Sequence, residues 1–131
     1  MKKDRKNIIL QSLAGMLEDR NLSKITTALL AEKSGITEAA LYRHFPSKRS
    51  IYAELFSFCD DAIFAKCNEL KKNKMSAKDK TKNAFVFFMM FVEKNKGFAR
   101  LLSREALSTN EQNVSDNVNQ FYERFELILR Q

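Results

Sequence analysis

Residues 25–48 read ITTALLAEKSGITEAALYRHFPSK, and this stretch predicts two short helices joined by a tight turn. Thr26 or Thr27 suits the N-cap of the first helix, because a threonine side-chain oxygen can accept a hydrogen bond from a backbone N–H of the first turn. Gly35 suits a left-handed residue at the end of that helix, since glycine adopts this conformation without steric penalty. These local signals define the first helix and its end.

The second helix is expected over residues 38–45, with Thr37 as its N-cap and Pro46 after its end. It stops there because proline disfavours helical geometry in the residue before it. Ala40 and Leu41 are expected to face the first helix, while the other side chains point elsewhere. Two helices joined by a glycine-containing turn of this length form a helix-turn-helix, whose second helix enters the major groove of DNA.

The outward side chains of this stretch decide between DNA binding and an ordinary helical hairpin within a bundle. The second helix carries few large apolar residues and therefore contributes little to a hydrophobic core. Its outward residues include hydroxyls, an arginine, a histidine and a tyrosine, which contact phosphates or base edges. DNA binding is the favoured interpretation. The residues expected at double-stranded DNA are Thr26, Thr27, Thr37, Glu38, Ala39, Ala40, Tyr42, Arg43, His44, Ser47 and Lys48.

The same stretch resembles the DNA-binding signature of the TetR family, in which a Tyr-x-His-Phe near the end of the recognition helix precedes Ser-Lys. Those residues here are Tyr42, His44, Phe45, Ser47 and Lys48. Within that family, residues 9–14, 38–48, 119–126 and 129–131 resemble the nucleoid occlusion factors. The resemblance covers nearly the whole chain.

The resemblance implies a fold, a function and two partners. The fold is all-α and TetR-like, with a three-helix N-terminal helix-turn-helix domain over residues 1–48 that continues into a partial helical regulatory and dimerisation domain over residues 49–131. The implied function is that of a DNA-bound homodimer that antagonises ring assembly by the tubulin-like protein FtsZ over the nucleoid. A TetR-type repressor with a small-molecule pocket is the alternative. A fragment that only pairs with full-length subunits and interferes with them is a third hypothesis.

Composition and charge agree with a helical DNA-binding protein. The 131 residues include three Gly and one Pro, which favours helices over a β-sandwich. The net charge is +7, and residues 1–50 carry ten Lys or Arg against five Asp or Glu. Positive charge therefore gathers around the predicted DNA-binding stretch, as an electrostatic footprint for DNA requires.

The sequence shows no arrangement typical of an active site or a metal site. A single His limits acid–base chemistry and there is no Gly-rich phosphate loop, so an enzyme is not expected. Cys59 and Cys67 have only His44 to accompany them, so no zinc site or other cofactor is expected. The longest apolar run, residues 84–92, is about half of a membrane span, and no signal-peptide core follows the N-terminus. We therefore expect a cytoplasmic, nucleoid-associated protein that binds no membrane.

Five further helices are expected, over residues 4–20, 48–72, 77–95, 98–108 and from Asn110 onward. The second of these is expected to carry an apolar stripe of Ile51, Leu55, Phe58, Ala62 and Ala65, which Tyr52, Phe56, Ile63 and Phe64 widen. Residues 84–92 are apolar all round, which favours a central core helix over one whose edge lines a partner groove. Gly97 is expected to stop that helix. The apolar stripe of the last helix is still in progress at the final residue, which predicts a C-terminally shortened protein.

The resemblance also implies a groove between the helices over residues 48–72 and 77–95 that receives the tail of FtsZ. Apolar side chains there would take apolar residues of the tail, and Lys66 and Lys94 would meet its acidic ones. Burial in the core is the alternative for the two phenylalanines of the set. The implied positions are Phe58, Lys66, Phe87, Met90, Lys94 and Asn95.

Overall fold

The computed structural model describes residues 2–19, 24–103, 107 and 111–130, with side chains from residue 5 onward. Every regular element in these residues is a helix, which confirms the predicted all-α class. No helix among them is long and apolar enough to cross a membrane. The elements are α1 (Lys2–Glu18), α2 (Thr27–Lys33), α3 (Glu38–His44), α4 (Lys48–Lys71), α5 (Ala77–Lys94), α6 (Lys96–Leu102) and α7 (Gln112–Arg130).

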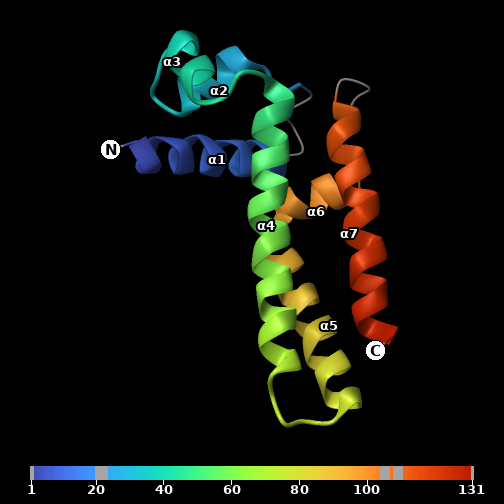
Figure 1. Ribbon diagram of the computed structural model, residues 1–131. Helices are drawn as coiled ribbons and strands as arrows, with labels where there is room; N and C mark the ends of the chain where they lie inside the picture. The colour runs from blue at the N-terminus through green and yellow to red at the C-terminus, as the bar shows by residue number, and fades with distance from the viewer. Residues whose placement is uncertain (1, 20–23, 104–106, 108–110, 131) are drawn as a thin grey trace.

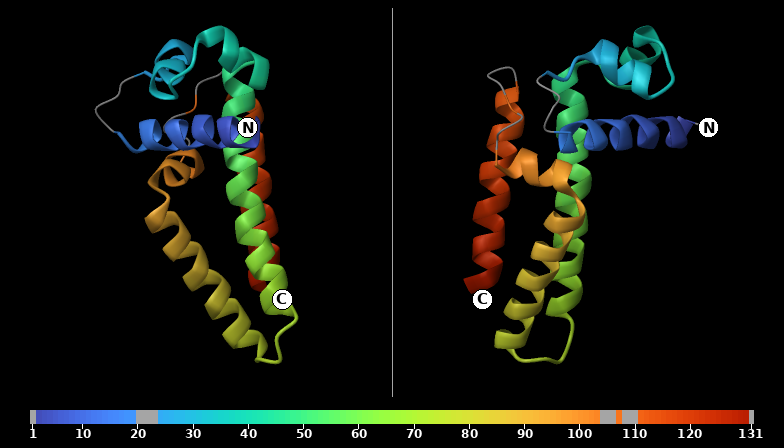
Figure 2. Two further views of the ribbon diagram at one scale, coloured as in Figure 1. Left: turned by 90° about the vertical axis from the view of Figure 1, so that its left-hand side faces the viewer. Right: turned by 180° about the vertical axis from the view of Figure 1, so that it is seen from behind.

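The helix α4 is the axis of the molecule (Figure 1). It contacts α1, α5, α6 and α7 along its length. At one end, α2 and α3 form a small unit above α1, which crosses α4 (Figures 1 and 2). Toward the other end, α5 and α7 run beside α4. One continuous set of buried side chains includes residues from all seven of these helices, so the end with α2 and α3 shares a core with the body.

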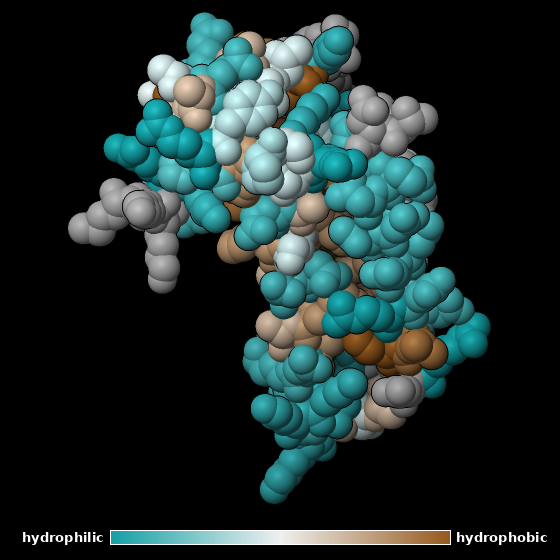
Figure 3. Space-filling view, turned by 45° about the horizontal axis from the view of Figure 1, so that its top comes forward, coloured by the Kyte–Doolittle hydropathy of each residue, from teal (hydrophilic) through white to brown (hydrophobic). Residues whose placement is uncertain are grey.

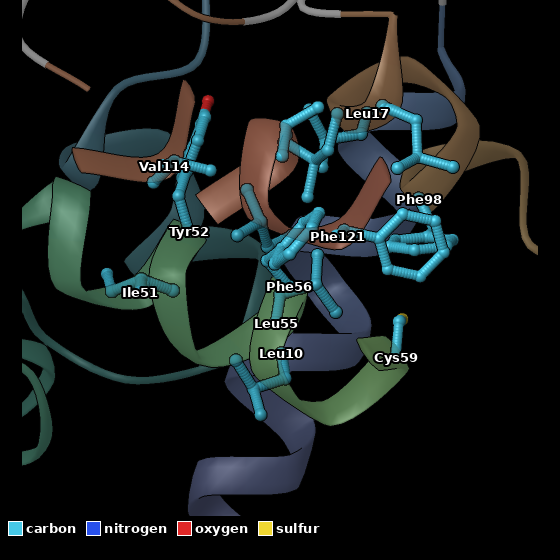
Figure 4. Packing of buried hydrophobic residues seen from close by; sticks show 14 of the residues in the cluster. Leu10, Leu17, Ile51, Tyr52, Leu55, Phe56, Cys59, Phe98, Val114 and Phe121 are labelled. Carbon is cyan, nitrogen blue, oxygen red and sulfur yellow. The ribbon is translucent and has the colours of Figure 1, made fainter. Parts of the chain in front are cut away.

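Aromatic side chains hold α4, α6 and α7 together in this core (Figure 4). The ring of Phe56 lies 5.5 Å from that of Phe98 and 6.2 Å from that of Phe121, centroid to centroid. Phe98 and Phe121 are 6.1 Å apart and meet edge to face. All three are buried, and offset or edge-on aromatic contacts add to the free energy gained from burying their area.

The prediction for Gly97 was wrong. This residue does not stop α5 but lies inside α6, where it is buried. A Cβ atom at Gly97 would lie 2.7 Å from the carbonyl oxygen of Ala14, so the glycine lets α6 approach the backbone of α1. The helix α6 is also shorter than expected, since it ends at Leu102. The predicted cap of the last helix, Asn110, lies outside the described residues.

The prediction that the centre of α5 is covered on every side was also wrong. Only Ala84 of this helix is buried, because α5 lies at the edge of the bundle and meets α4, α6 and α7 from one side. The opposite side, which we call the outer face of α5, exposes Phe85, Val86, Met89 and Met90 by 45 to 50% each. The helix therefore presents a large apolar surface to solvent.

The buried face of α4 confirms most of the predicted apolar stripe, since Ile51, Leu55, Ile63 and Phe64 are buried, but two positions differ. Phe58 is 64% exposed and Ala65 is exposed, so neither belongs to the core. Both cysteines are instead buried on this face as free thiols, and burial raises the pKa of Cys59 to about 12. The sequence pattern misplaced these two positions because α4 is contacted from several directions, so its buried side is wider than one row of residues.

Candidate nucleic-acid interface

Two threonine caps begin the helices α2 and α3. The Oγ1 atom of Thr26 accepts a hydrogen bond from the backbone N–H of Leu29 at 3.1 Å, so Thr26 and not Thr27 is the N-cap of α2. The Oγ1 atom of Thr37 accepts one from the N–H of Ala40 at 3.1 Å. Both caps satisfy backbone donors that the first turn of a helix leaves unpaired, which fixes where each helix starts.

The turn between these helices depends on Gly35, whose φ of 71° confirms the predicted left-handed residue. The N–H of Gly35 donates to the carbonyl of Glu32 at 3.1 Å, and the N–H of Ile36 donates to the carbonyl of Ala31 at 3.0 Å. This pair of bonds is a Schellman motif, which closes the C-terminus of a helix. The chain then turns into α3 in a fixed direction. We call residues 26–45 the helix-turn-helix unit.

One side of α3 anchors it within the fold. Leu41 is fully buried, as expected, and Phe45 is 4% exposed. Ala40 and His44 are only partly buried. The ammonium group of Lys6 lies 5.4 Å from the centre of the Phe45 ring, which brings a positive charge of α1 to the end of α3. A short helix with so few buried side chains leaves most of its surface for a partner.

The other side of α3 is the outward face. Glu38, Ala39 and Arg43 are exposed, and Tyr42 is 46% exposed. Thr27 of α2 joins this face, because its Oγ1 atom donates to Glu38 Oε2 at 3.2 Å and lies 3.1 Å from the hydroxyl of Tyr42. Teal and pale side chains predominate over this end of the molecule (Figure 3). The structure thus brings Thr27, Glu38 and Tyr42 together on one polar surface, whereas Ala40 and His44 lie partly buried on the anchoring side.

Ser47 and Lys48 stand where α3 passes into α4. The Oγ atom of Ser47 accepts from the N–H of Ser50, and the Oγ atom of Ser50 accepts from the N–H of Ser47, both at 3.2 Å, which forms a capping box. The Nζ atom of Lys48 lies 3.7 Å from Oε1 of Glu111 and 5.6 Å from the centre of the Tyr52 ring. The start of α4 is therefore fixed from both its backbone and its first side chain.

Glu111 is buried, with 2% of its side chain exposed, and it immediately precedes α7. Its negative charge adds to the effect of burial, and together they raise the pKa of Tyr52 to about 12. Sequence analysis missed this residue. A signal for it was present, because Glu111 continues the spacing of three and four residues that Val114, Val118 and Phe121 follow on the buried side of α7.

The helix α6 fastens α1 to the body. The guanidinium Nη1 of Arg100 donates to the backbone carbonyl of Leu17 at 2.7 Å, at the C-terminal end of α1. Cations are favoured at this end of a helix, where carbonyl groups lack helical partners. Together with the close approach of Gly97 to Ala14, this bond fixes the position of α1 relative to α4 and α7.

Of the residues implied in a partner groove, the structure brings together Lys66 of α4 and Phe87 of α5, whereas Met90 lies on the outer face of α5. Phe58 is 64% exposed and Met90 is 50% exposed, while Phe87 is partly buried. The ammonium of Lys66 lies 5.9 Å from the centre of the Phe87 ring and 3.4 Å from Glu69. Lys94 is exposed. The side chain of Asn95 caps the end of α5, since its Nδ2 donates a hydrogen bond to the carbonyl of Phe91 at 2.8 Å.

Comparison with known proteins identifies the family. The family described as "Bacterial regulatory proteins, tetR family" matches residues 9–55. The nucleoid occlusion factor SlmA of Vibrio vulnificus (strain YJ016) is 38% identical over 131 residues, which cover 99% of this chain and 67% of that protein. The chain belongs to the SlmA group of the tetR family. SlmA of Vibrio campbellii (strain ATCC BAA-1116) is 39% identical with the same coverage. SlmA of Vibrio cholerae serotype O1 (strain ATCC 39315 / El Tor Inaba N16961) is 38% identical and covers 98% and 66% of the two chains.

These relatives confirm the predicted TetR-like fold. The range matched by the tetR family runs from α1 through the helix-turn-helix unit into the first turns of α4. The match to SlmA proteins continues through α5, α6 and α7, so it includes the body of the molecule as well. The chain spans about two thirds of the length of the SlmA proteins it matches.

This SlmA-group chain also has a hollow of about 280 Å³ between the ends of α4, α5 and α7 that lie away from the helix-turn-helix unit. Cys67, Leu70 and Ala84 contribute apolar surface, and Lys71 and Lys80 contribute positive charge. The Nζ atom of Lys80 donates to the carbonyl of Lys71 at 3.0 Å, which holds the start of α5 against the end of α4.

Proposed function

We propose that this chain is a sequence-specific DNA-binding nucleoid occlusion factor that binds chromosomal sites and antagonises FtsZ ring assembly over the nucleoid. One observation carries the proposal: the polar outward face of α3 belongs to a chain that is 38% identical to an SlmA protein over almost all of its length. The name of that relative states nucleoid occlusion. Apolar side chains that the fold leaves exposed or partly exposed on α4 and α5 support the second half of the proposal.

The proposed DNA complex places α3 in the major groove. Thr37 and Ala39 lie at the start of this helix, where residues reach base edges. Arg43 at its exposed end contacts a phosphate. Lys48 and the N-terminus of α4 contact a second phosphate, because the first turn of a helix offers unpaired N–H groups and a positive partial charge. Tyr42, His44 and Ser47 contribute hydroxyl and imidazole contacts around this site.

Mobility shifts with a selected duplex and a random duplex test the DNA half of the proposal. Lys48→Met should weaken binding about equally on both duplexes, because phosphate contacts carry no sequence information. Ala39→Gln should change sequence preference without changing stability, since Ala39 is exposed and has no capping role. Lys74→Met, which changes an exposed lysine in the turn between α4 and α5, is the matched control and should bind as the unchanged protein does. Unchanged affinity and preference in both test variants would refute the assignment.

The FtsZ half of the proposal rests on apolar and basic side chains that α4 and α5 leave exposed or partly exposed. Phe58, Phe87 and Met90 offer apolar surface that the fold leaves at least partly open, which suits the apolar side chains of a short segment. Lys66 and Lys94 stand beside them and can meet acidic side chains. Asn95 offers its side-chain carbonyl oxygen and the second N–H of its amide, since one N–H already bonds the carbonyl of Phe91.

Charge reversal tests the groove. Lys66→Glu or Lys94→Glu should abolish binding of an FtsZ tail peptide while DNA affinity and helicity remain unchanged. Lys82→Glu is the control, because it reverses an exposed lysine on α5 that lies outside the groove set. Titration with a labelled peptide measures the three affinities. Peptide binding that survives the first two changes would exclude this groove.

The proposed function includes a homodimer, and a ligand-responsive repressor is the alternative to it. Two-fold operators require two DNA-binding units at a fixed spacing, so we propose that the active species is a homodimer. Sedimentation with a palindromic duplex tests this by the number of chains bound.

The hollow beside Cys67 is the observation that favours a repressor. Ala84→Leu should fill that hollow. In a repressor it should remove the response of DNA binding to an inducer, while the affinity for the FtsZ tail peptide stays unchanged.

A further inference from the structure

The outward face of α3 carries a negative charge, although DNA is negative. Glu38 is the first residue of α3 and is exposed. A carboxylate in this position lowers the affinity for DNA in general, unless a base supplies a hydrogen-bond donor to it. We propose that Glu38, held by Thr27 and Tyr42, accepts a hydrogen bond from the N4 amino group of a cytosine in the major groove. The inference rests on the proposed DNA-binding function and deepens it by naming a base.

The three side chains form one directed chain of hydrogen bonds. Thr27 Oγ1 donates to Glu38 Oε2 at 3.2 Å. A threonine hydroxyl has only one hydrogen, so its contact of 3.1 Å with Tyr42 must run the other way, with the tyrosine hydroxyl as donor. The chain of bonds therefore runs from Tyr42 through Thr27 to Glu38, and it crosses from α3 to α2 and back.

This chain holds the carboxylate of Glu38 in one orientation. One of its oxygens is engaged by Thr27, and among the described residues no donor meets the other oxygen, Oε1. An exposed glutamate normally samples many rotamers and loses this freedom when it binds. Because Thr27 and Tyr42 restrict Glu38 before DNA arrives, Oε1 is already placed for a donor from outside.

The chemistry of the base edges selects cytosine. An ionised carboxylate only accepts hydrogen bonds. In the major groove guanine presents two acceptors, and thymine presents an acceptor and a methyl group, so both repel or fail to bond it. Adenine presents a donor beside an acceptor, which suits an amide better than a carboxylate. Cytosine presents the N4 amino donor alone, and glutamate is a recognised partner for it.

The place of Glu38 in the fold agrees with base contact. The N-terminal residues of a recognition helix are those that reach base edges. Glu38 follows the Thr37 cap directly and shares the outward face with Ala39, whose small side chain leaves room for a base pair. Tyr42 stands one turn further along the same face, and its ring is 46% exposed.

The test compares base preferences of the whole chain and its variants by selection from a random duplex library, followed by affinities for single-base changes in the selected site. The unchanged protein should prefer C·G at one position of each half-site by roughly tenfold. Glu38→Gln should shift that position toward A·T, because an amide pairs with the N6 and N7 atoms of adenine. Glu38→Ala should lose the preference there and bind random DNA more tightly, since a negative charge is removed.

Thr27→Val tests the hydrogen-bond chain itself. Valine keeps the shape of threonine but removes the hydroxyl, so discrimination at the cytosine position should fall several-fold while the circular dichroism stays unchanged. Lys48→Met is the control, because it should weaken all duplexes equally. If the unchanged protein selects no site, the proposed DNA function fails, and this inference fails with it. If it selects a site and both Glu38 variants select the same site with the same discrimination, only the role of Glu38 is overturned.

Discussion

The ion pair between Lys48 and Glu111 leads to a sharp prediction for stability. Lys48→Met removes the charge but keeps an aliphatic side chain beside the Tyr52 ring. At a separation of 3.7 Å and an effective dielectric constant of about 20, the Coulomb attraction is about 4.5 kcal/mol. The Lys48 side chain is 34% exposed, so solvent screens part of this attraction. We expect the free energy of unfolding to fall by about 1–3 kcal/mol, because a buried carboxylate loses a counter-charge.

A double-mutant cycle with Glu111→Gln isolates the pair. Urea unfolding followed by circular dichroism at pH 7 should give a coupling energy of about 1–2 kcal/mol between the two positions. Lys66 and Glu69 supply the matched control. The charged atoms of this pair lie 3.4 Å apart, and the Lys66 side chain is 35% exposed, similar to the 34% of Lys48. The Glu69 side chain, however, is 66% exposed. Coupling in the control cycle should therefore stay below about 0.5 kcal/mol.

Equal coupling energies in the two cycles would refute the reasoning, since the lysines are similarly exposed while the carboxylates are 2% and 66% exposed. DNA affinity gives a second readout that separates the two residues. Lys48→Met should weaken binding, whereas Glu111→Gln should strengthen it, because Lys48 then meets a phosphate without a competing carboxylate. A loss of affinity in Glu111→Gln would show that Glu111 instead holds Lys48 in place for DNA.

Three further predictions concern packing, pH and assembly. Gly97→Ala should lower the free energy of unfolding in urea by about 1–3 kcal/mol, because its Cβ would press on the backbone of α1, whereas Gly15→Ala, with open space around its Cβ, should raise it by about 0.5–1 kcal/mol. The folded state keeps the proton on Tyr52 up to pH about 12 while the unfolded chain loses it near 10, so stability should fall as pH rises between these values, and Tyr52→Phe should make the fall shallower in alkaline urea titrations. The outer face of α5 should cause self-association, which light scattering at high concentration would show as particles larger than 15.2 kDa, and a clean monomer that binds no apolar dye would contradict it.

The helix-turn-helix unit could be predicted from sequence because its signals are local. The left-handed residue Gly35, the cap Thr37 and the stop before Pro46 each act within a few residues of the bond they control. The cap of α2 shows the limit of such signals. Thr26 and Thr27 are chemically equivalent, and only the position of Leu29 in the folded chain decides which one caps the helix.

The body of the molecule depended on contacts that no local pattern encodes. An apolar run such as the centre of α5 indicates affinity for apolar neighbours, but it does not say how many neighbours the fold provides. Gly97 looked like a helix stop because glycine often is one, yet its role is set by Ala14, which is distant in sequence. The hydrogen bond from Thr27 to Glu38 likewise joins two helices and could not be read from either alone.

The length and placement of α4 make it a lever. Its 24 residues span about 36 Å at 1.5 Å per residue, and α1 and α6 cross it between its ends. With the crossing near Phe56, about 12 Å from the start of α4, a tilt of about 5° would carry the end that bears α3 through roughly 1 Å, a third of the length of a typical hydrogen bond. A ligand that pushes on the α5 side of α4 would therefore need only a small rotation to break the proposed contacts between α3 and DNA bases. In a pair of such levers the two displacements would change the distance between the recognition helices, and DNA with a fixed half-site spacing would resist the motion.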